Sequence, residues 1–482
     1  MHSVLFPTPS KSLEVGALQD IHLSLRSRII MRKWPIAVVA VMLGAGAAFM
    51  FGWIPLAYHR SGWDTGQDLW GIFRGAHYVA WDDLGGVYTP GTGMVTLPGI
   101  AVLLAPVAMI GSRFHLLESY APFFFPHPTV ALILQPVELL LAGTAVFAGD
   151  ALADRLGVDR RRRIAVCALV GLVALPVAAV WGHAEDVLAM TFAMYALDSA
   201  IAGKWKRCGW LLGFGIVMQP LVALLLPLLL GFAPSGKRVL LGIRALVLSV
   251  IFVGVAFAGN PSGTYLSLVR QPTPPSVNHA TPWSSLAPTV SAAGTAIDTS
   301  IRSIRSIPQA GHRMLTLSSS TVHAGSTVSG GPGRILDLVL AVLLGVFVAR
   351  RRPSATGLVW WALVILASRC FFEAVMTPYY LAPPLLLGLV LASLAPGRRF
   401  WMVSGITIVI SVFAYWHLSP WSWWLPIVAG MAAILYLTHP ADPRESPRSL
   451  AATTTSLLTR ESGSEMDGIR APSGTSGDSA SR

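Results

Sequence analysis

The sequence predicts an all-α, polytopic membrane protein with about 12 transmembrane helices. Of its 482 residues, 54% are hydrophobic and only 12% are charged, whereas a soluble protein carries about 25% charged residues. Apolar segments close to the length of one membrane crossing, about 20 residues, recur along the chain. The segments that connect them are of two kinds, one with basic clusters and one without.

The basic connections define the predicted cytoplasmic side, because Lys and Arg next to a transmembrane helix stay in the cytoplasm. They lie at 160–163, 204–207, 237–238, 350–352 and 398–399. The other connections contain acids, histidines, prolines and aromatics, at 64–83, 183–186, 278–283 and 369–380. We therefore expect both termini in the cytoplasm and the functional residues on the extracytoplasmic side. The net charge of +12 then reflects orientation and contact with membrane lipids, and nucleic acid is not an expected partner.

The first predicted span is 34–57, which is too long for the core of a signal peptide. Residues 1–33 then form a cytoplasmic N-terminal segment. Met31 is an alternative start of the chain, because it directly precedes a basic pair and this span.

The outer loop 58–127 is predicted to hold interfacial helices. An amphipathic helix runs from Leu69 onward, with Asp68 at its N-cap position. The apolar segment 94–111 is only about 18 residues long, near the lower limit for a span, and it contains two prolines. Counting it as a span would move 160–163 to the outside, so we interpret it as a re-entrant or interfacial helix.

The remaining spans follow from apolar length. In the first half they are 128–150, 164–181, 187–203, 208–219, 221–232 and 239–258. In the second half they are 335–349, 356–368, 381–395, 401–417 and 422–438. The break at Gln219-Pro220 leaves two half-length helices, which membrane proteins tolerate where such helices line a cavity or pack on protein.

The spans form one bundle over 34–438, with a second outer loop at 259–333. Within this loop the stretch 291–333 is rich in Ser, Thr, Ala and Gly, which predicts flexibility. The polar tail 439–482 is predicted to be a disordered cytoplasmic extension, because it lacks the apolar residues that a core needs.

Two groups on the outer side are candidates for chemistry. In the simpler interpretation, Asp68 only caps a helix. In the functional interpretation, its carboxylate lies at the lip of an outward cavity and takes a proton from an acceptor hydroxyl. His183, Glu185 and Asp186 share one corner, where they bind sugar hydroxyls or simply place negative charge at a helix start. A divalent metal shared with Asp68 is the further alternative. Because His-x-Glu-Asp matches no zinc signature, we assign no metal and no cofactor.

Several motifs resemble those of the integral-membrane glycosyltransferases of the GT-C superfamily, in particular the polyprenyl-phosphate-mannose-dependent mannosyltransferases of actinobacteria. The matching segments are Asp68-Leu69-Trp70 with Arg74-Gly75-Ala76, Val87-Tyr88-Thr89-Pro90, Leu103-Leu104-Ala105-Pro106, Gly182-His183-Ala184-Glu185-Asp186, and Trp210-Leu211-Leu212-Gly213 with Gln219-Pro220. The resemblance covers roughly residues 35–400 and depends on degenerate motifs. The family's Lys-Pro is replaced by Gln219-Pro220, its Gly-Gln-x-Asn corner by Gly182 to Glu185, and the first glycine of its half-helix motif by Trp210.

The resemblance implies that Asp68 is the catalytic base of an inverting transfer. The donor would be a sugar, such as mannose, on a polyprenyl phosphate, and the acceptor an envelope glycolipid or glycan. The leaving phosphate needs cationic or hydrogen-bond donor groups. Arg369 is the main candidate, with Arg74 and His279 assisting.

Each of the remaining candidates has a simpler alternative. Arg369 and Glu373 are spaced i,i+4, which also suits a structural ion pair. Tyr379 could stack on a sugar or belong to an interfacial aromatic belt, and the tryptophans of 416–424 suit such a belt too. Glu138 lies in the middle of a span, where an ionisable group is a functional candidate or a helix contact.

Two other functions remain open. A transporter or flippase for a lipid-linked or anionic solute would need polar groups through the bundle to the inner face, where the chain offers mainly Glu138. An inactive scaffold with the same fold would account for Gln219 and for the altered corner. The concentration of candidates on one side favours an enzyme with an extracytoplasmic site.

Overall fold

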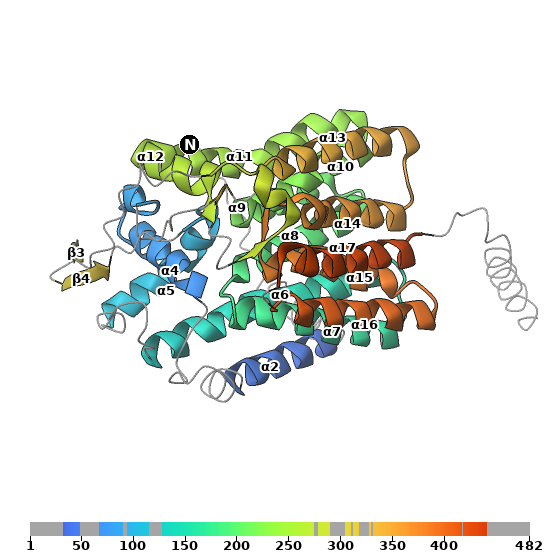
Figure 1. Ribbon diagram of the computed structural model, residues 1–482, viewed down its shortest axis with the longest axis horizontal. Helices are drawn as coiled ribbons and strands as arrows, with labels where there is room; N and C mark the ends of the chain where they lie inside the picture. Colours follow the sequence, from blue (N-terminus) through green and yellow to red (C-terminus); the bar gives the residue numbers. More distant parts are fainter. Residues whose placement is uncertain are drawn as a thin grey trace, which may run out of the picture. The chain divides into compact units, whose positions relative to one another are not determined.

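The computed structural model describes residues 32–48, 67–89, 94–114, 128–273, 278–289, 304–309, 312–317, 327–328, 331–416 and 418–440. The chain divides into two compact units, Met1–Thr438 and His439–Arg482. The described residues of the first unit form 15 α-helices with a few short strands (Figure 1). Apart from the residues next to the bundle, the predicted segments 1–33 and 439–482 lie outside the described residues.

The all-α prediction is confirmed for the described residues, and a helix occurs at each predicted span. The helices of the N-terminal half are α2 (Lys33–Ala48), α4 (Gln67–Ala80), α5 (Gly99–Arg113), α6 (Pro128–Arg155), α7 (Arg160–Ala179), α8 (Ala184–Ile201), α9 (Trp205–Met218) and α10 (Leu225–Phe232). Those of the C-terminal half are α11 (Ser235–Gly259), α12 (Pro261–Thr264), α13 (Gly333–Arg351), α14 (Ala355–Phe372), α15 (Ala382–Ala392), α16 (Gly397–Phe413) and α17 (Pro420–Leu437).

Five of the described helices are long and apolar enough to cross a membrane. They are α7, α11, α14, α17 and the part of α6 from Ile133 to Arg155. These helices indicate a multi-pass membrane protein. Other apolar helices, such as α2, α5 and α15, are shorter, so the number of about 12 crossings stays a prediction.

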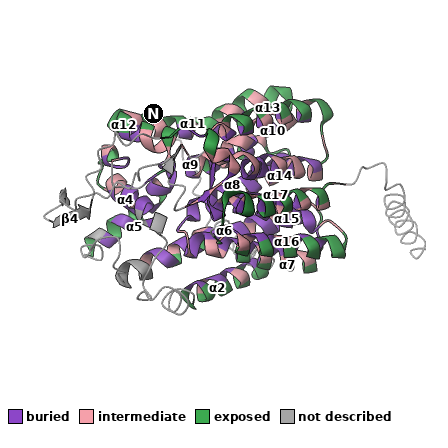
Figure 2. Cartoon of the chain, viewed as in Figure 1, coloured by how far each residue is buried: buried purple, intermediate pink, exposed green. Residues whose placement is uncertain are grey.

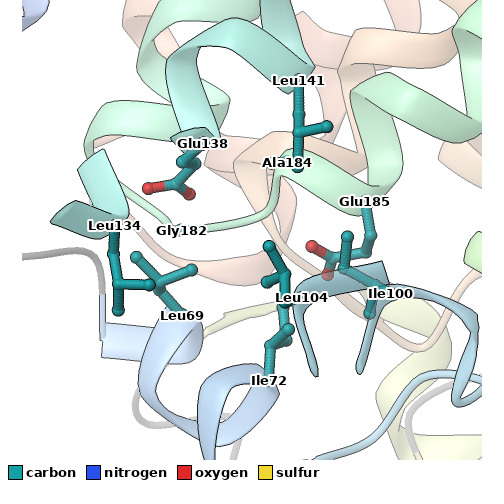
Figure 3. A pocket seen from close by; sticks show the side chains of 10 residues that line it. All are labelled: Leu69, Ile72, Ile100, Leu104, Leu134, Glu138, Leu141, Gly182, Ala184 and Glu185. Carbon is teal, nitrogen blue, oxygen red and sulfur yellow. The ribbon is translucent and has the colours of Figure 1, made fainter. Parts of the chain in front are cut away.

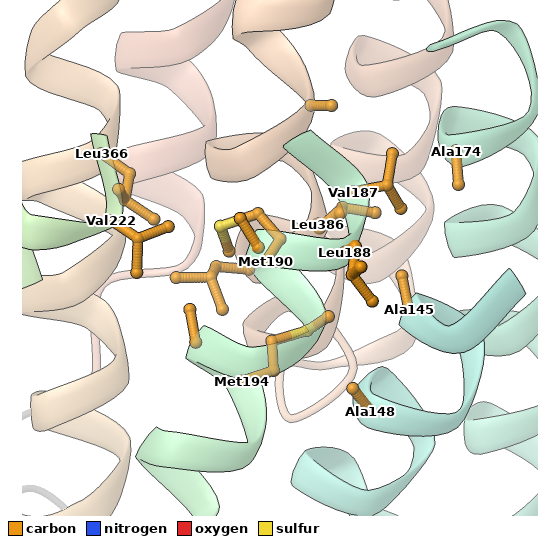
Figure 4. Packing of buried hydrophobic residues seen from close by; sticks show 14 of the residues in the cluster. Ala145, Ala148, Ala174, Val187, Leu188, Met190, Met194, Val222, Leu366 and Leu386 are labelled. Carbon is orange, nitrogen blue, oxygen red and sulfur yellow. The ribbon is translucent and has the colours of Figure 1, made fainter. Parts of the chain in front are cut away.

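The core of the bundle lies around α8, which is buried on nearly all sides (Figure 2). Ala145 and Ala148 of α6 belong to this core, together with Leu188 and Met190 of α8 (Figure 4). Small side chains let membrane helices approach closely, and a helix that is apolar all round belongs in the interior. In contrast, α11 and α13 expose much of their apolar surface, as expected of helices that face lipid.

The predicted basic connections gather at one end of the bundle. Asp150 near the end of α6 binds both Arg32 and Arg163. Arg162 donates from Nη1 to the carbonyl oxygens of Ser393 at 2.9 Å and Ala395 at 2.6 Å, which ties α7 to the end of α15. We call this the basic end; the segments with acids and aromatics lie towards the other.

The interfacial helix α4 is amphipathic, as predicted. Leu69, Ile72, Phe73 and Ala76, spaced i, i+3, i+4 and i+7, are all buried. The helix begins at Gln67, so Asp68 lies in its first turn instead of at the expected N-cap. Helix ends are uncertain by one or two residues, and the side chain of Asp68 lies outside the part of the chain that the structure describes.

Short antiparallel strand pairs connect the loops. The pairs are β1 (Pro272–Thr273) with β5 (Thr327–Val328), β2 (His279–Ala280) with β6 (Val375–Met376), and β3 (Ile304–Gln309) with β4 (His312–Leu317). Two of these pairs use residues of 291–333, a stretch for which the composition predicts flexibility. β3 and β4 are separated by only two residues, the spacing of a hairpin, and the flexibility of the stretch stays a prediction.

Candidate functional site

The corner between α7 and α8 brings three polar side chains to one point. Gly182 has φ +75°, a conformation that favours glycine. Its N–H donates to the Ala178 carbonyl at 3.0 Å, and the His183 N–H donates to the Val177 carbonyl at 3.1 Å. Such a glycine ends a helix and reverses the chain within a few residues. Helix α8 therefore begins at Ala184, directly after His183.

The side chains of this corner are buried and linked to one another. His183 Nδ1 lies 2.5 Å from Glu185 Oε1 and 3.5 Å from Asp186 Oδ2. Gln219 Nε2 donates to Asp186 Oδ1 at 2.7 Å. Gln219 is extended, with φ −144° and ψ 115°, because the residue before a proline avoids the helical region. The predicted break at Pro220 thus turns Gln219 towards the corner.

Tyr379 covers the corner from the connection between α14 and α15. Its ring stacks on His183, with ring centroids 3.8 Å apart and an interplanar angle of 27°. Trp181 meets the edge of the same tyrosine at 5.9 Å. Tyr379 is buried against the corner, which does not suit an exposed aromatic belt.

Arg369 and Glu373 form the ion pair that their spacing predicts. Arg369 donates from Nε to Glu373 Oε2 at 2.6 Å and from Nη2 to Oε1 at 3.2 Å. Its guanidinium carbon lies 3.2 Å from the centroid of the Tyr380 ring. Arg369 also interacts electrostatically with Asp186, which connects this pair to the corner.

A second arginine reaches the same carboxylate. Arg334 Nη2 lies 3.2 Å from Glu373 Oε1 and donates to Gln271 Oε1 at 2.6 Å. Burial alone would raise the pKa of Glu373, but the two arginines outweigh it and hold this pKa below its ordinary value. A second carboxylate, that of the buried Asp337, interacts electrostatically with Arg369, Arg334 and Glu373.

A small cavity joins the corner to α4 and α6. Leu69 and Ile72 of α4 line it together with Glu138 of α6 and Glu185 of α8 (Figure 3). Its volume is about 10 Å³, enough for about one water molecule. The start of α4, which carries Asp68, therefore lies close to the corner.

Four carboxylate oxygens at the cavity and the corner lack a hydrogen-bond partner among the described residues. They are both oxygens of Glu138, Oε2 of Glu185 and Oδ2 of Asp186. A buried polar group without a partner costs roughly 1–3 kcal/mol. Such a cluster is favourable only when protons, water or a cation satisfy it.

The corner also has the geometry of a cation site. The ligand atoms of His183, Glu185 and Asp186 all lie within 4.8 Å of one another. Nitrogen and carboxylate donors suit several divalent metals. The alternative of a divalent metal at this corner therefore has a geometric basis.

The other candidates lie on neighbouring elements. Arg74 and His77 are buried on α4. His279 stacks on Trp423 at 4.3 Å with an interplanar angle of 4°. Trp423 donates to the Ala414 carbonyl at 3.2 Å and is fully buried, so the prediction that this tryptophan belongs to an interfacial belt is wrong. The stack on His279 explains its burial.

Sequence reasoning missed Arg334 and Trp181. Arg334 directly follows Gly333 at the start of α13, and its place in a predicted outer loop was the signal that could have drawn attention to it. Trp181 precedes Gly182 at the end of an apolar span, and the local sequence gives no signal that distinguishes it from other residues at span ends. Their roles follow from contacts with Glu373 and Tyr379, which are distant in sequence.

The comparisons with known proteins do not add a family. A scan against protein-family models finds no match, and a search of curated proteins finds no significant match. The GT-C resemblance therefore remains a prediction from motifs.

Proposed function

We propose that this protein is a membrane glycosyltransferase that moves a sugar from a polyprenyl phosphate to an envelope glycolipid or glycan on the extracytoplasmic side. One observation carries the proposal. The first turn of α4, the corner 182–186 and the connection 369–380 are far apart in sequence and meet at one place in the bundle. These are the segments that the GT-C resemblance and the outer-side candidates pointed to.

Asp68 is the general base in this proposal. Its carboxylate takes the proton of the acceptor hydroxyl while that oxygen bonds to the anomeric carbon of the donor. The bond between this carbon and the phosphate oxygen breaks, and its electron pair leaves with the polyprenyl phosphate. A single displacement of this kind inverts the anomeric centre. The guanidinium groups of Arg369 and Arg334 stabilise the leaving phosphate.

The corner then binds the sugar. Asp186 and Glu185 each keep one oxygen without a partner among the described residues, and carboxylates accept hydrogen bonds from sugar hydroxyls. The cavity of about 10 Å³ is far below the roughly 300–1,000 Å³ of a typical ligand pocket. The sugar therefore lies beside this cavity, between the corner and Arg369, and a water or ion occupies the cavity itself.

The scarcity of charged side chains along α6 between Glu138 and the basic end supports an enzyme over a transporter. Beyond Glu138, α6 continues towards the basic end with Leu139, Ala142, Ala145 and Val146, all buried. A transported solute needs polar groups along its path through the membrane. The polar cluster lies at one end, as expected for a site that acts on one side.

The test compares Asp68→Asn with wild-type protein, expressed at equal level in a strain that lacks the gene. Envelope glycolipids and glycans are compared by mass spectrometry. We expect a sugar to be missing in the strain, restored by wild type, and not restored by Asp68→Asn, with transfer reduced by at least about 100-fold.

Asp82→Asn is the matched control, because Asp82 is an exposed turn residue of the same outer segment. It should restore the sugar fully. Full restoration by Asp68→Asn would show that the base is assigned wrongly. Accumulation of an unmodified lipid-linked precursor without any change in glycans would favour the transporter.

A further inference from the structure

A second pocket lies at the basic end, and none of the residues that line it belongs to the proposed active site. Its volume is about 800 Å³, and it lies between α9 and α11. Five cations line it: Lys204, Lys206, Arg207, Lys237 and Arg244. The lining residues include no acid. The pocket therefore suits an anionic ligand with a volume well above that of inorganic phosphate.

Arg244 is the most informative of these cations. It lies nine residues after the start of α11 at Ser235, which places it about 14 Å along the helix. Helix α11 is one of the candidate membrane spans. Arg244 has no hydrogen bond or ion pair in the described part of the chain. An arginine at such depth is costly unless an anion or water satisfies it.

Two glycines of α9 hold Arg244 at the pocket. A Cβ at Gly209 would lie 3.0 Å from the Arg244 Cβ and 3.5 Å from its Cδ. A Cβ at Gly213 would lie 2.7 Å from the Arg244 carbonyl oxygen. The two helices thus pack backbone to backbone through a Gly-x-x-x-Gly pair, and the arginine stem crosses α9 at Gly209.

Beyond the cations the pocket is apolar and open. Trp210, Phe214 and Leu240 line it and are exposed by 37%, 42% and 46%. A large exposed apolar surface on a membrane helix faces lipid chains. A charged region next to an apolar one has the layout of a phospholipid, with its headgroup above its acyl chains.

We propose that this pocket binds one anionic phospholipid of the cytoplasmic leaflet. Its phosphate lies between Lys237 and Arg244, and its acyl chains run along Trp210 and Phe214. Basic pockets between helices on the cytoplasmic side bind anionic headgroups in this way. The positive-inside rule accounts for cations in the connections but not for Arg244 within a span. The inference does not depend on the proposed transferase activity.

The test uses the full-length protein in detergent, titrated with phosphatidylglycerol or phosphatidylcholine, with bound lipid measured by native mass spectrometry. We expect wild type to prefer phosphatidylglycerol. The double variant Lys237→Gln/Arg244→Gln should bind it about 30-fold more weakly, about fivefold for each cation. Arg398→Gln/Arg399→Gln, which removes the same charge from exposed residues at the same end, should bind like wild type.

Three results would overturn the inference. They are equal binding of phosphatidylcholine, unchanged binding by the double variant, and displacement of phosphatidylglycerol by an equal concentration of inorganic phosphate, which would indicate a free-anion site. If the double variant fails to fold, Trp210→Ala replaces it. This variant should bind phosphatidylglycerol more weakly, because the acyl chains lose a contact, and inorganic phosphate should still fail to displace the lipid. Unchanged binding of phosphatidylglycerol would contradict a lipid in this pocket.

Discussion

Glu373 holds two arginines that come from different helices. Arg369 lies on α14 and Arg334 at the start of α13. Because these cations lower the pKa of Glu373 below its ordinary value of 4.5, the carboxylate contributes stability above pH 4.5. This contribution is lost as the pH falls through the lower pKa of the folded protein.

Replacing Glu373 by Gln should destabilise the protein by about 3–5 kcal/mol at pH 7, because the buried Arg369 loses its anion. The variant should also lose the part of the acid dependence that begins below pH 4.5. Equilibrium unfolding in detergent between pH 3.5 and 7 measures both effects.

Arg334→Gln is the control for this prediction. The side chain of Arg334 is 36% exposed, so its removal should cost at most about 1 kcal/mol, while Glu373 keeps Arg369. Equal costs for the two variants would show that the carboxylate is not held mainly by Arg369.

Side-chain contacts differ in how far the sequence could predict them. The pair of Arg369 and Glu373 followed from local i,i+4 spacing, and the position of Gln219 followed from Pro220. The stack of His183 on Tyr379 and the contact of Arg334 with Glu373 depend on the packing of helices distant in sequence. Local patterns contain no information on such packing. The role of Asp68 stays a prediction.

Helices α10 and α13 meet without side chains between them. A Cβ at Gly231 would lie 2.1 Å from the Gly345 carbonyl oxygen, and one at Gly345 would lie 2.5 Å from the Pro227 carbonyl oxygen. Backbone atoms cannot move aside as a flexible side chain can. The contact therefore requires glycine on both helices.

Gly231→Ala should destabilise the bundle by about 1–3 kcal/mol, because the added methyl group forces α10 and α13 apart. Gly254→Ala on α11 is the matched control, since nothing lies within 4 Å of the Cβ it would add. This change should be neutral or stabilising by up to about 1 kcal/mol, as alanine favours helix. Thermal unfolding in detergent compares the two, and an equal loss for both would contradict the tight contact.

Helix positions were predictable where apolar length defines them. The predicted span 239–258 lies within α11, Ser235–Gly259, and the predicted span 356–368 lies within α14, Ala355–Phe372. Composition gave no sign of the pairing of β3 with β4, because strand pairing depends on register and not on the content of Ser and Gly; the flexibility of 291–333 stays a prediction. The start of α4 was predicted at Leu69, two residues after its observed start at Gln67, because helix ends are generally uncertain by one or two residues.

The two ends of the bundle differ in charge, and this difference predicts its orientation in the membrane. The basic end carries 160–163, 204–207 and 398–399, whereas the corner 182–186 and the loop after α4 lie away from it. Lys and Arg next to spans stay cytoplasmic. The proposed active site then faces outward.

Single cysteines test this orientation in intact cells. Asp82→Cys should react with a membrane-impermeant maleimide, and Arg398→Cys should react only after permeabilisation, since both positions are exposed. The native Cys167, Cys208 and Cys370 are buried, so they should add little background labelling by the maleimide. The reverse labelling pattern would place the corner in the cytoplasm and rule out transfer on the outer side.

The stack of His279 on Trp423 has a consequence for biosynthesis. Trp423 lies on α17, the last helix of the bundle, while His279 lies on the loop whose Thr281 donates to the Glu373 carbonyl at 2.6 Å. A ribosome completes α17 only after every other helix has been made. The loop that contains His279 therefore gains its contact with Trp423 last. A nascent chain that stops before α17 should enter the membrane without this contact beside the proposed active site.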